Sequence, residues 1–70
     1  MERLIHLFLN GEARHGVAAQ TVDELVAELD LPGPTLLIEH NGKALHRGEW
    51  HSASLQDGDR LEFVRIVAGG

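Results

Sequence analysis

Short apolar runs alternate with turn signals along much of this chain. The first run, residues 4–9, ends at Asn10–Gly11. This dipeptide strongly favours a two-residue hairpin turn, because both residues tolerate positive φ. The chain should therefore reverse there and return as a second strand over residues 12–18. A run over residues 35–40 that ends at Asn41–Gly42 predicts a second hairpin in the same way.

One helix is predicted between the two hairpins. Thr21 and Glu24 have the spacing of a capping box, in which the first side chain caps the helix and the second reaches back. From Val22 onward, apolar residues recur at i, i+3, i+4 and i+7, which places them on one helical stripe. The helix should end by Leu31, because Pro-Gly-Pro at residues 32–34 cannot continue it.

The remaining segments complete the fold class. Residues 47–55 are predicted to be irregular, with Trp50 filling the core beneath them. Residues 56–59 have the chemistry of a turn, and residues 61–67 form a last strand. One short helix among about five strands indicates an α+β fold, a β-grasp with a mixed sheet and the helix packed on one face. The first and last strands should be central, parallel neighbours.

Since one helix covers one face of a sheet, strand alternation predicts which side chains stay exposed. The residues assigned to the core are Ile5, Leu7, Leu9, Leu36, Ile38, Leu61 and Phe63. The residues assigned to the open face as a partner docking surface are Phe8, Leu37, Val64 and Ile66. The alternative is that these four are ordinary exposed apolar residues.

Composition restricts the function classes. The 70 residues suffice for one domain, expected over residues 1–66, followed by a flexible tail over residues 67–70. The absence of cysteine excludes disulfides, a thiolate zinc site and a cysteine nucleophile. The small size favours a binding module or a carrier over an independent enzyme.

Charge and hydropathy disfavour two kinds of partner. The net charge is −5 and the basic residues are scattered, which argues against nucleic-acid binding and suits a partner with a basic docking surface. No apolar run approaches the length needed to span a membrane. The first residues do not resemble a signal peptide, so a cytoplasmic location is expected.

The sequence ends on Gly69–Gly70, directly after the last apolar strand. Glycine lacks a Cβ and suits a backbone that must pass through a narrow space. We therefore expect Val67, Ala68 and Gly69 to thread into the active site of a partner and to present Gly70 there.

An ordered set of motifs resembles the ThiS family, the ubiquitin-like β-grasp sulfur carrier proteins of thiamine biosynthesis. The matching features are Asn10–Gly11, Thr21-Val22-x-Glu24-Leu25, Asn41–Gly42, Arg47-x-x-Trp50, Gln56–Asp59 and Ile66–Gly70. One departure is His46, where members of the family often have proline.

The resemblance implies a chemical cycle at Gly70. An adenylyltransferase of the ubiquitin-activating type would use ATP to adenylate the Gly70 carboxylate. Sulfur from a donor such as a cysteine desulfurase would then give a thiocarboxylate, which a thiazole synthase consumes. The chain itself would supply no catalytic residue and bind no cofactor.

Three alternatives remain open at this stage. The small subunit of molybdopterin synthase uses similar tail chemistry, but such chains tend to be longer and to carry prolines before the final glycines. The others are an unmodified β-grasp interaction module and a ubiquitin-like protein modifier.

Other candidate sites are weaker. The five histidines lack metal-site spacing and are expected to face solvent, so no metal site is predicted. The acidic residues Asp57, Asp59 and Glu62 lack the spacing of a calcium loop and are assigned to the turn.

Overall fold

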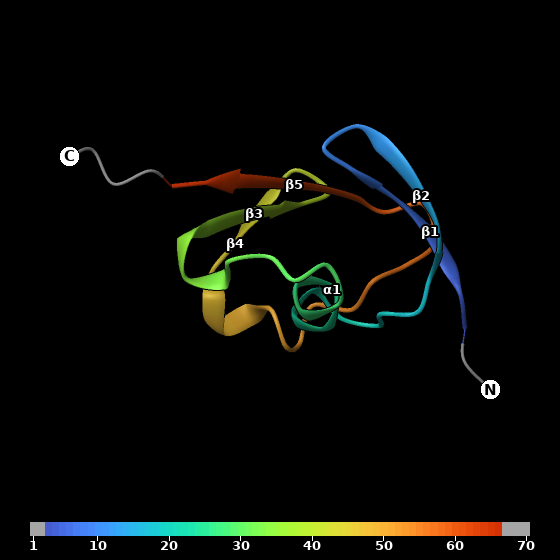
Figure 1. Ribbon diagram of the computed structural model, residues 1–70, viewed down its shortest axis with the longest axis horizontal. Helices are drawn as coiled ribbons and strands as arrows, with labels where there is room; N and C mark the ends of the chain where they lie inside the picture. The colour runs from blue at the N-terminus through green and yellow to red at the C-terminus, as the bar shows by residue number, and fades with distance from the viewer. Residues whose placement is uncertain (1–2, 67–70) are drawn as a thin grey trace.

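A computed structural model describes residues 3–66, so the predicted tail over residues 67–70 lies outside the described residues. In chain order the strands are β1 (Ile5–Leu9), β2 (Glu12–Val17), β3 (Leu36–His40), β4 (Lys43–Leu45) and β5 (Arg60–Arg65). The helix α1 (Val22–Glu28) follows β2, and two short 3₁₀ turns lie at Gly33–Thr35 and Arg47–Glu49. Figure 1 shows β3, β4 and β5 extending away from the β1–β2 hairpin.

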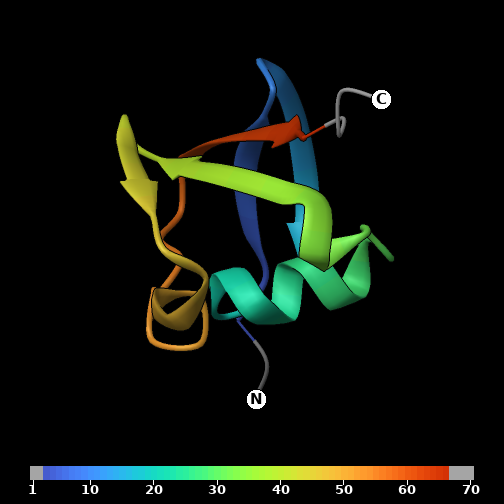
Figure 2. The same cartoon turned by 90° about the vertical axis from the view of Figure 1, so that its left-hand side faces the viewer.

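The five strands form one mixed sheet in the order β2-β1-β5-β3-β4. β1 and β5 run parallel at the centre, and the other neighbours are antiparallel. Helix α1 lies against one face of this sheet (Figure 2). The predicted β-grasp and its central parallel pair are therefore confirmed.

Both predicted hairpin turns are present, and their backbone angles explain why Asn and Gly occupy them. Asn10 and Asn41 have φ of 50° and 51°, and the glycines that follow have φ of 83° and 84°. These positive values are open to Gly and tolerated by Asn, whereas a β-branched side chain would be strained there.

Helix α1 begins where the capping box predicts and ends at Glu28, within the predicted limit at Leu31. The backbone N–H of Glu24 donates to Thr21 Oγ1 over 3.2 Å. The Glu24 carboxylate accepts from the backbone N–H of Gln20, one residue before the cap, over 2.7 Å. Leu29 caps the other end, and Asp30 leaves the helix with φ of 53°. Within the described chain, no helix is long and apolar enough to cross a bilayer.

The core lies between α1 and the inner face of the sheet. The fully buried large side chains are Leu7, Val22, Leu25, Ile38, Leu55 and Leu61. Trp50 is 3% exposed and belongs to the same cluster, which confirms its predicted core role. The Arg47 guanidinium lies 5.1 Å from the Trp50 ring centroid and covers it at the surface.

Candidate functional site: the open face of the sheet

The face of the sheet opposite α1 carries an exposed apolar row. Leu37 on β3 and Val64 on β5 are direct cross-strand partners, and each is 54% exposed. Ile66 follows with the same parity and is 50% exposed. Its backbone N–H donates to Thr35 O over 2.7 Å, so the β3–β5 ladder continues to the last described residue. We call Leu37, Val64 and Ile66 the apolar row.

Phe8 also points to the open face, but the structure sets it apart from the apolar row. It pairs with Arg60, four residues before Val64 on β5, or about 13 Å along the strand. The Arg60 guanidinium lies 5.7 Å from the Phe8 ring centroid. The His6 ring packs edge-on against the Phe8 ring, with 5.9 Å between the two ring centroids. Phe8 is accordingly half-buried. Of the four predicted docking residues, three therefore lie together and one lies apart.

An acidic row separates Phe8 from the apolar row. Glu39 on β3 and Glu62 on β5 are direct cross-strand partners, and both are exposed. Beside them the face is hollowed. A hollow of about 200 Å³ is lined by Glu39, Asn41, Gly42, Arg60 and Glu62. A second, of about 320 Å³, is lined by Phe8, Gly11, Arg60, Leu61 and Glu62.

Two asparagine side chains hold β5 in register, one from each hairpin turn. Asn10 Oδ1 accepts from the backbone N–H of Phe63, and Asn41 Oδ1 accepts from the backbone N–H of Arg60, each over 2.8 Å. The backbone N–H groups of the same two asparagines also donate to β5, at Leu61 O and Arg60 O. The strand that leads toward Gly70 is therefore fastened from both neighbours.

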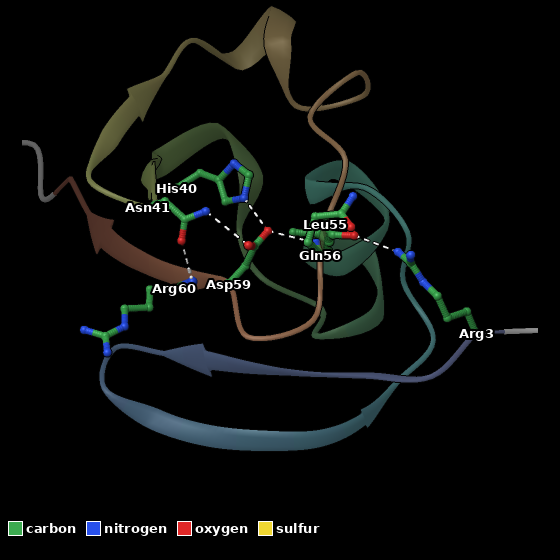
Figure 3. Close-up of polar contacts among 7 residues, drawn as sticks. All are labelled: Arg3, His40, Asn41, Leu55, Gln56, Asp59 and Arg60. Atoms are coloured by element: carbon green, nitrogen blue, oxygen red, sulfur yellow. Dashed lines mark hydrogen bonds and ion pairs between the residues drawn. The ribbon is translucent and has the colours of Figure 1, made fainter.

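A polar cluster centred on Asp59 anchors the start of β5 (Figure 3). Asp59 is 8% exposed. Its Oδ2 lies 2.7 Å from His40 Nε2 and accepts from the Gln56 backbone N–H over 2.9 Å. Its Oδ1 accepts from Asn41 Nδ2 over 3.1 Å. Burial raises the pKa of Asp59, but the hydrogen bonds with His40, Gln56 and Asn41 outweigh it and hold that pKa below its usual value.

This cluster corrects one prediction and extends another. His40 does not face solvent: its side chain is 18% exposed and paired with Asp59. Asp59 does form the predicted turn, through Gln56, and it also makes this side-chain hydrogen bond with His40. The strand alternation that placed Ile38 inward also places His40 inward, and that was the available signal. The partner, 19 residues later, was not visible in the local pattern.

The described side chains do not form a recognisable reaction centre. The His40–Asp59 pair has no adjacent nucleophile among its contacts, which are Gln56 and Asn41. Over residues 3–66 there is no group of three or more His, Cys, Asp or Glu side chains placed to hold a metal ion.

A helix on one face of a five-stranded mixed sheet, with central parallel first and last strands, defines a ubiquitin-like β-grasp protein. The ThiS family model matches residues 7–70. The chain therefore belongs to the ThiS family.

Individual relatives agree with this assignment. The chain is 30% identical to the sulfur carrier protein ThiS of Escherichia coli, over 94% of this chain and 100% of that one. The crystal structure of a thiamine biosynthesis protein (ThiS) from Geobacter metallireducens superposes with a TM-score of 0.82 at 29% identity, covering 94% of this chain and 100% of that one.

A third relative is much longer. The chain is 33% identical to a thiazole synthase of Paramagnetospirillum magneticum, over 91% of this chain. It spans only 20% of the length of that protein.

Proposed function

We propose that this protein is a sulfur carrier of thiamine biosynthesis whose working group is the Gly70 carboxylate. The observation that carries the proposal is the family match, which extends through Gly69 and Gly70. It is supported by the structure, in which β5, the central strand leading toward these residues, is hydrogen-bonded to one asparagine side chain from each hairpin turn. The absence of cysteine from the sequence agrees with cargo carried on the backbone.

The reaction begins with activation of a poor electrophile. An adenylyltransferase of the ubiquitin-activating type transfers AMP from ATP to the Gly70 carboxylate and releases pyrophosphate. A persulfide, formed on a cysteine by a donor such as a cysteine desulfurase, attacks the acyl carbon and AMP leaves. A second thiol then cleaves the resulting acyl disulfide, so that a disulfide forms and the Gly70 thiocarboxylate is freed.

The freed thiocarboxylate donates its sulfur to the thiazole ring on a thiazole synthase. A segment similar to this chain occupies a fifth of a protein named thiazole synthase, which supports such an enzyme as the partner. The carrier contributes position rather than a catalytic group, because holding a reacting end in place converts an encounter into a local step.

The open face is the docking surface in this proposal. The apolar row lies on the part of the sheet where β5 ends, so a partner that takes Gly70 would cover Leu37, Val64 and Ile66. Phe8, beyond the acidic row, would contribute at the margin of the interface. Because the same surface serves at least two enzymes in turn, we expect a modest area and fast exchange.

The test is an intact-mass measurement. The purified chain is incubated with the adenylyltransferase of the same organism, ATP and a sulfur donor. The expected result is the mass increase for exchange of one oxygen by sulfur, localised to Gly70 by fragmentation. A chain extended by one residue after Gly70 is the control and should stay unmodified. An unchanged mass in the native chain would refute the proposal.

A further inference from the structure

The acidic row is unusual because its members repel each other. Glu39 and Glu62 are direct cross-strand partners on an exposed face. Like charges in this position destabilise a sheet, because their Cβ atoms lie only about 5 Å apart. Within residues 3–66 neither carboxylate makes an ion pair or accepts a hydrogen bond. The folded chain therefore keeps a local repulsion for which the described contacts offer no compensation.

Cationic side chains nearby are engaged elsewhere. The Arg60 guanidinium lies over the Phe8 ring, and although Arg60 lines the same hollow as Glu39 and Glu62, it pairs with neither carboxylate. Lys43 Nζ lies 3.8 Å from Glu49 Oε2. Arg65 pairs with Leu36 and so has the opposite strand parity to Glu62. None of these three cations forms an ion pair with Glu39 or Glu62, so both carboxylates are free to receive a cation from another molecule.

The surface beside the acidic row has room for such a group. Glu39 and Glu62 line a hollow of about 200 Å³ together with Asn41, Gly42 and Arg60. On β4 the cross-strand partner of Glu39 is Ala44, whose side chain is too short to cover the carboxylate. A side chain from another protein can therefore approach Glu39 and Glu62 from outside.

The acidic row adjoins the apolar row without a break. Leu37 and Val64 lie two residues further along the same two strands, or about 7 Å away. A surface that covers one row therefore extends over the other. This continuity favours a protein partner over a free ion, as does the lack of a third His, Cys, Asp or Glu ligand in the described chain.

We propose that the hollow at Glu39 and Glu62 receives an arginine or lysine side chain from the partner protein that takes the Gly70 end. On that partner, the cation should lie about 7 Å beyond the apolar patch that covers Leu37 and Val64. An arginine suits the site best, because its planar fork can bridge two carboxylates. The net charge of −5 would draw such a basic surface into the encounter. This inference rests on the proposed function.

The test uses the double variant Glu39→Gln/Glu62→Gln with the adenylyltransferase of the same organism. Pyrophosphate release gives KM and kcat for the carrier. We expect KM to rise about tenfold with kcat unchanged, the size expected for losing a charge-assisted hydrogen bond. The dependence of KM on salt should also weaken, because the interface loses a charge pair.

Glu28→Gln is the matched control. Glu28 is an exposed carboxylate at the end of α1. This helix lies on the face of the sheet opposite the acidic row (Figure 2). The single variants Glu39→Gln and Glu62→Gln each change the net charge by the same amount as Glu28→Gln. The Glu28→Gln control should leave KM unchanged. The double variant should unfold at the same temperature as the native chain or higher, because a repulsion is removed. A lower unfolding temperature would contradict the proposal.

The outcomes separate the two proposals. If the native chain is not adenylated at all, the proposed function fails. If it is adenylated and the double variant keeps the KM of the Glu28→Gln control, the acidic hollow is not a contact and this inference fails. NMR titration of the carrier with Ca²⁺ tests whether a metal ion, rather than a partner side chain, occupies the hollow. Saturable shifts at the Glu39 and Glu62 amides well below millimolar Ca²⁺ would replace the inference with a metal site.

Discussion

The two faces of β5 differ in what they contact, although they belong to one short strand. Leu61 and Phe63 point toward α1, and Leu61 is only 1% exposed. Glu62 and Val64, between and beyond them, point to the open face and are exposed. Strand alternation thus assigns neighbouring residues to different tasks. Substitutions on one face should alter stability, and substitutions on the other should alter recognition.

The largest expected effect is on the inner face. Leu61→Ala should lower the free energy of unfolding by about 2–5 kcal/mol, because a buried side chain is lost and a cavity remains. Urea denaturation followed by circular dichroism measures the change. For so small a domain this is a large part of the total stability. A loss below about 1 kcal/mol would show that the inner face of β5 is less tightly packed than Leu61 indicates.

The Asp59 cluster should give the next largest effect. Asp59→Asn replaces one acceptor oxygen by a donor where Gln56 and Asn41 already donate, so about 1–3 kcal/mol of stability should be lost. Thermal and urea unfolding measure it. Asp57→Asn is the control, since the Asp57 side chain is 61% exposed. Equal losses in the two variants would contradict a special role for Asp59.

The same cluster predicts a pH dependence. The pKa of Asp59 is lowered in the folded chain, against about 3.9 for an unfolded aspartate. Its stabilising contribution is therefore complete above about pH 4 and is lost as the pH falls through the lower folded pKa. The difference in unfolding free energy between the native chain and Asp59→Asn should shrink in acid. A difference that is constant from pH 6 to about pH 2 would contradict the lowered pKa.

The two asparagine contacts allow a paired comparison along β5. Asn41→Gly and Asn10→Gly keep a residue that accepts positive φ and remove the side-chain acceptor. Asn10→Gly should cost about 0.5–1.5 kcal/mol, and Asn41→Gly should cost more, because it also removes the Nδ2 donor to Asp59. Hydrogen exchange should accelerate at the Arg60 amide in the first variant and at the Phe63 amide in the second. Exchange that accelerates equally along all of β5 in both variants would indicate general loosening rather than two local fastenings.

The smallest stability effect is expected on the open face. Leu37→Ser and Val64→Ser remove exposed side chains and should change the unfolding free energy by less than about 0.5 kcal/mol. In the adenylation assay the same variants should raise KM, because apolar contact with the partner is lost. An unchanged KM in both variants would mean that the apolar row is ordinary surface. The open face of β5 would then have no role in recognition.

The local sequence pattern was sufficient to predict most of the fold. Period-two alternation placed Ile38 and Leu61 inward and Leu37 outward, and the two Asn-Gly pairs located both hairpins. Those features depend on residues that are neighbours in sequence. The docking surface and the tail residues Val67 to Gly70 stay predictions.

The contacts across the sheet could not be predicted in the same way. The Asn-Gly pairs were interpreted from φ alone, yet each asparagine side chain also binds a β5 amide about 20 or 50 residues away. The separation of Phe8 from the apolar row likewise depends on the parallel register of β1 and β5. Such pairings require the strand order before side-chain positions can be compared.

The central place of β5 has a further consequence for any enzyme that uses this carrier. Because ladders on both sides would have to break before β5 could slide, the position of Ile66 relative to the sheet is constant. Four residues follow Ile66, so Gly70 can extend no more than about 14 Å from it. In the proposed function, that upper limit sets how deep the partner's reaction centre can lie below the surface on which the carrier rests.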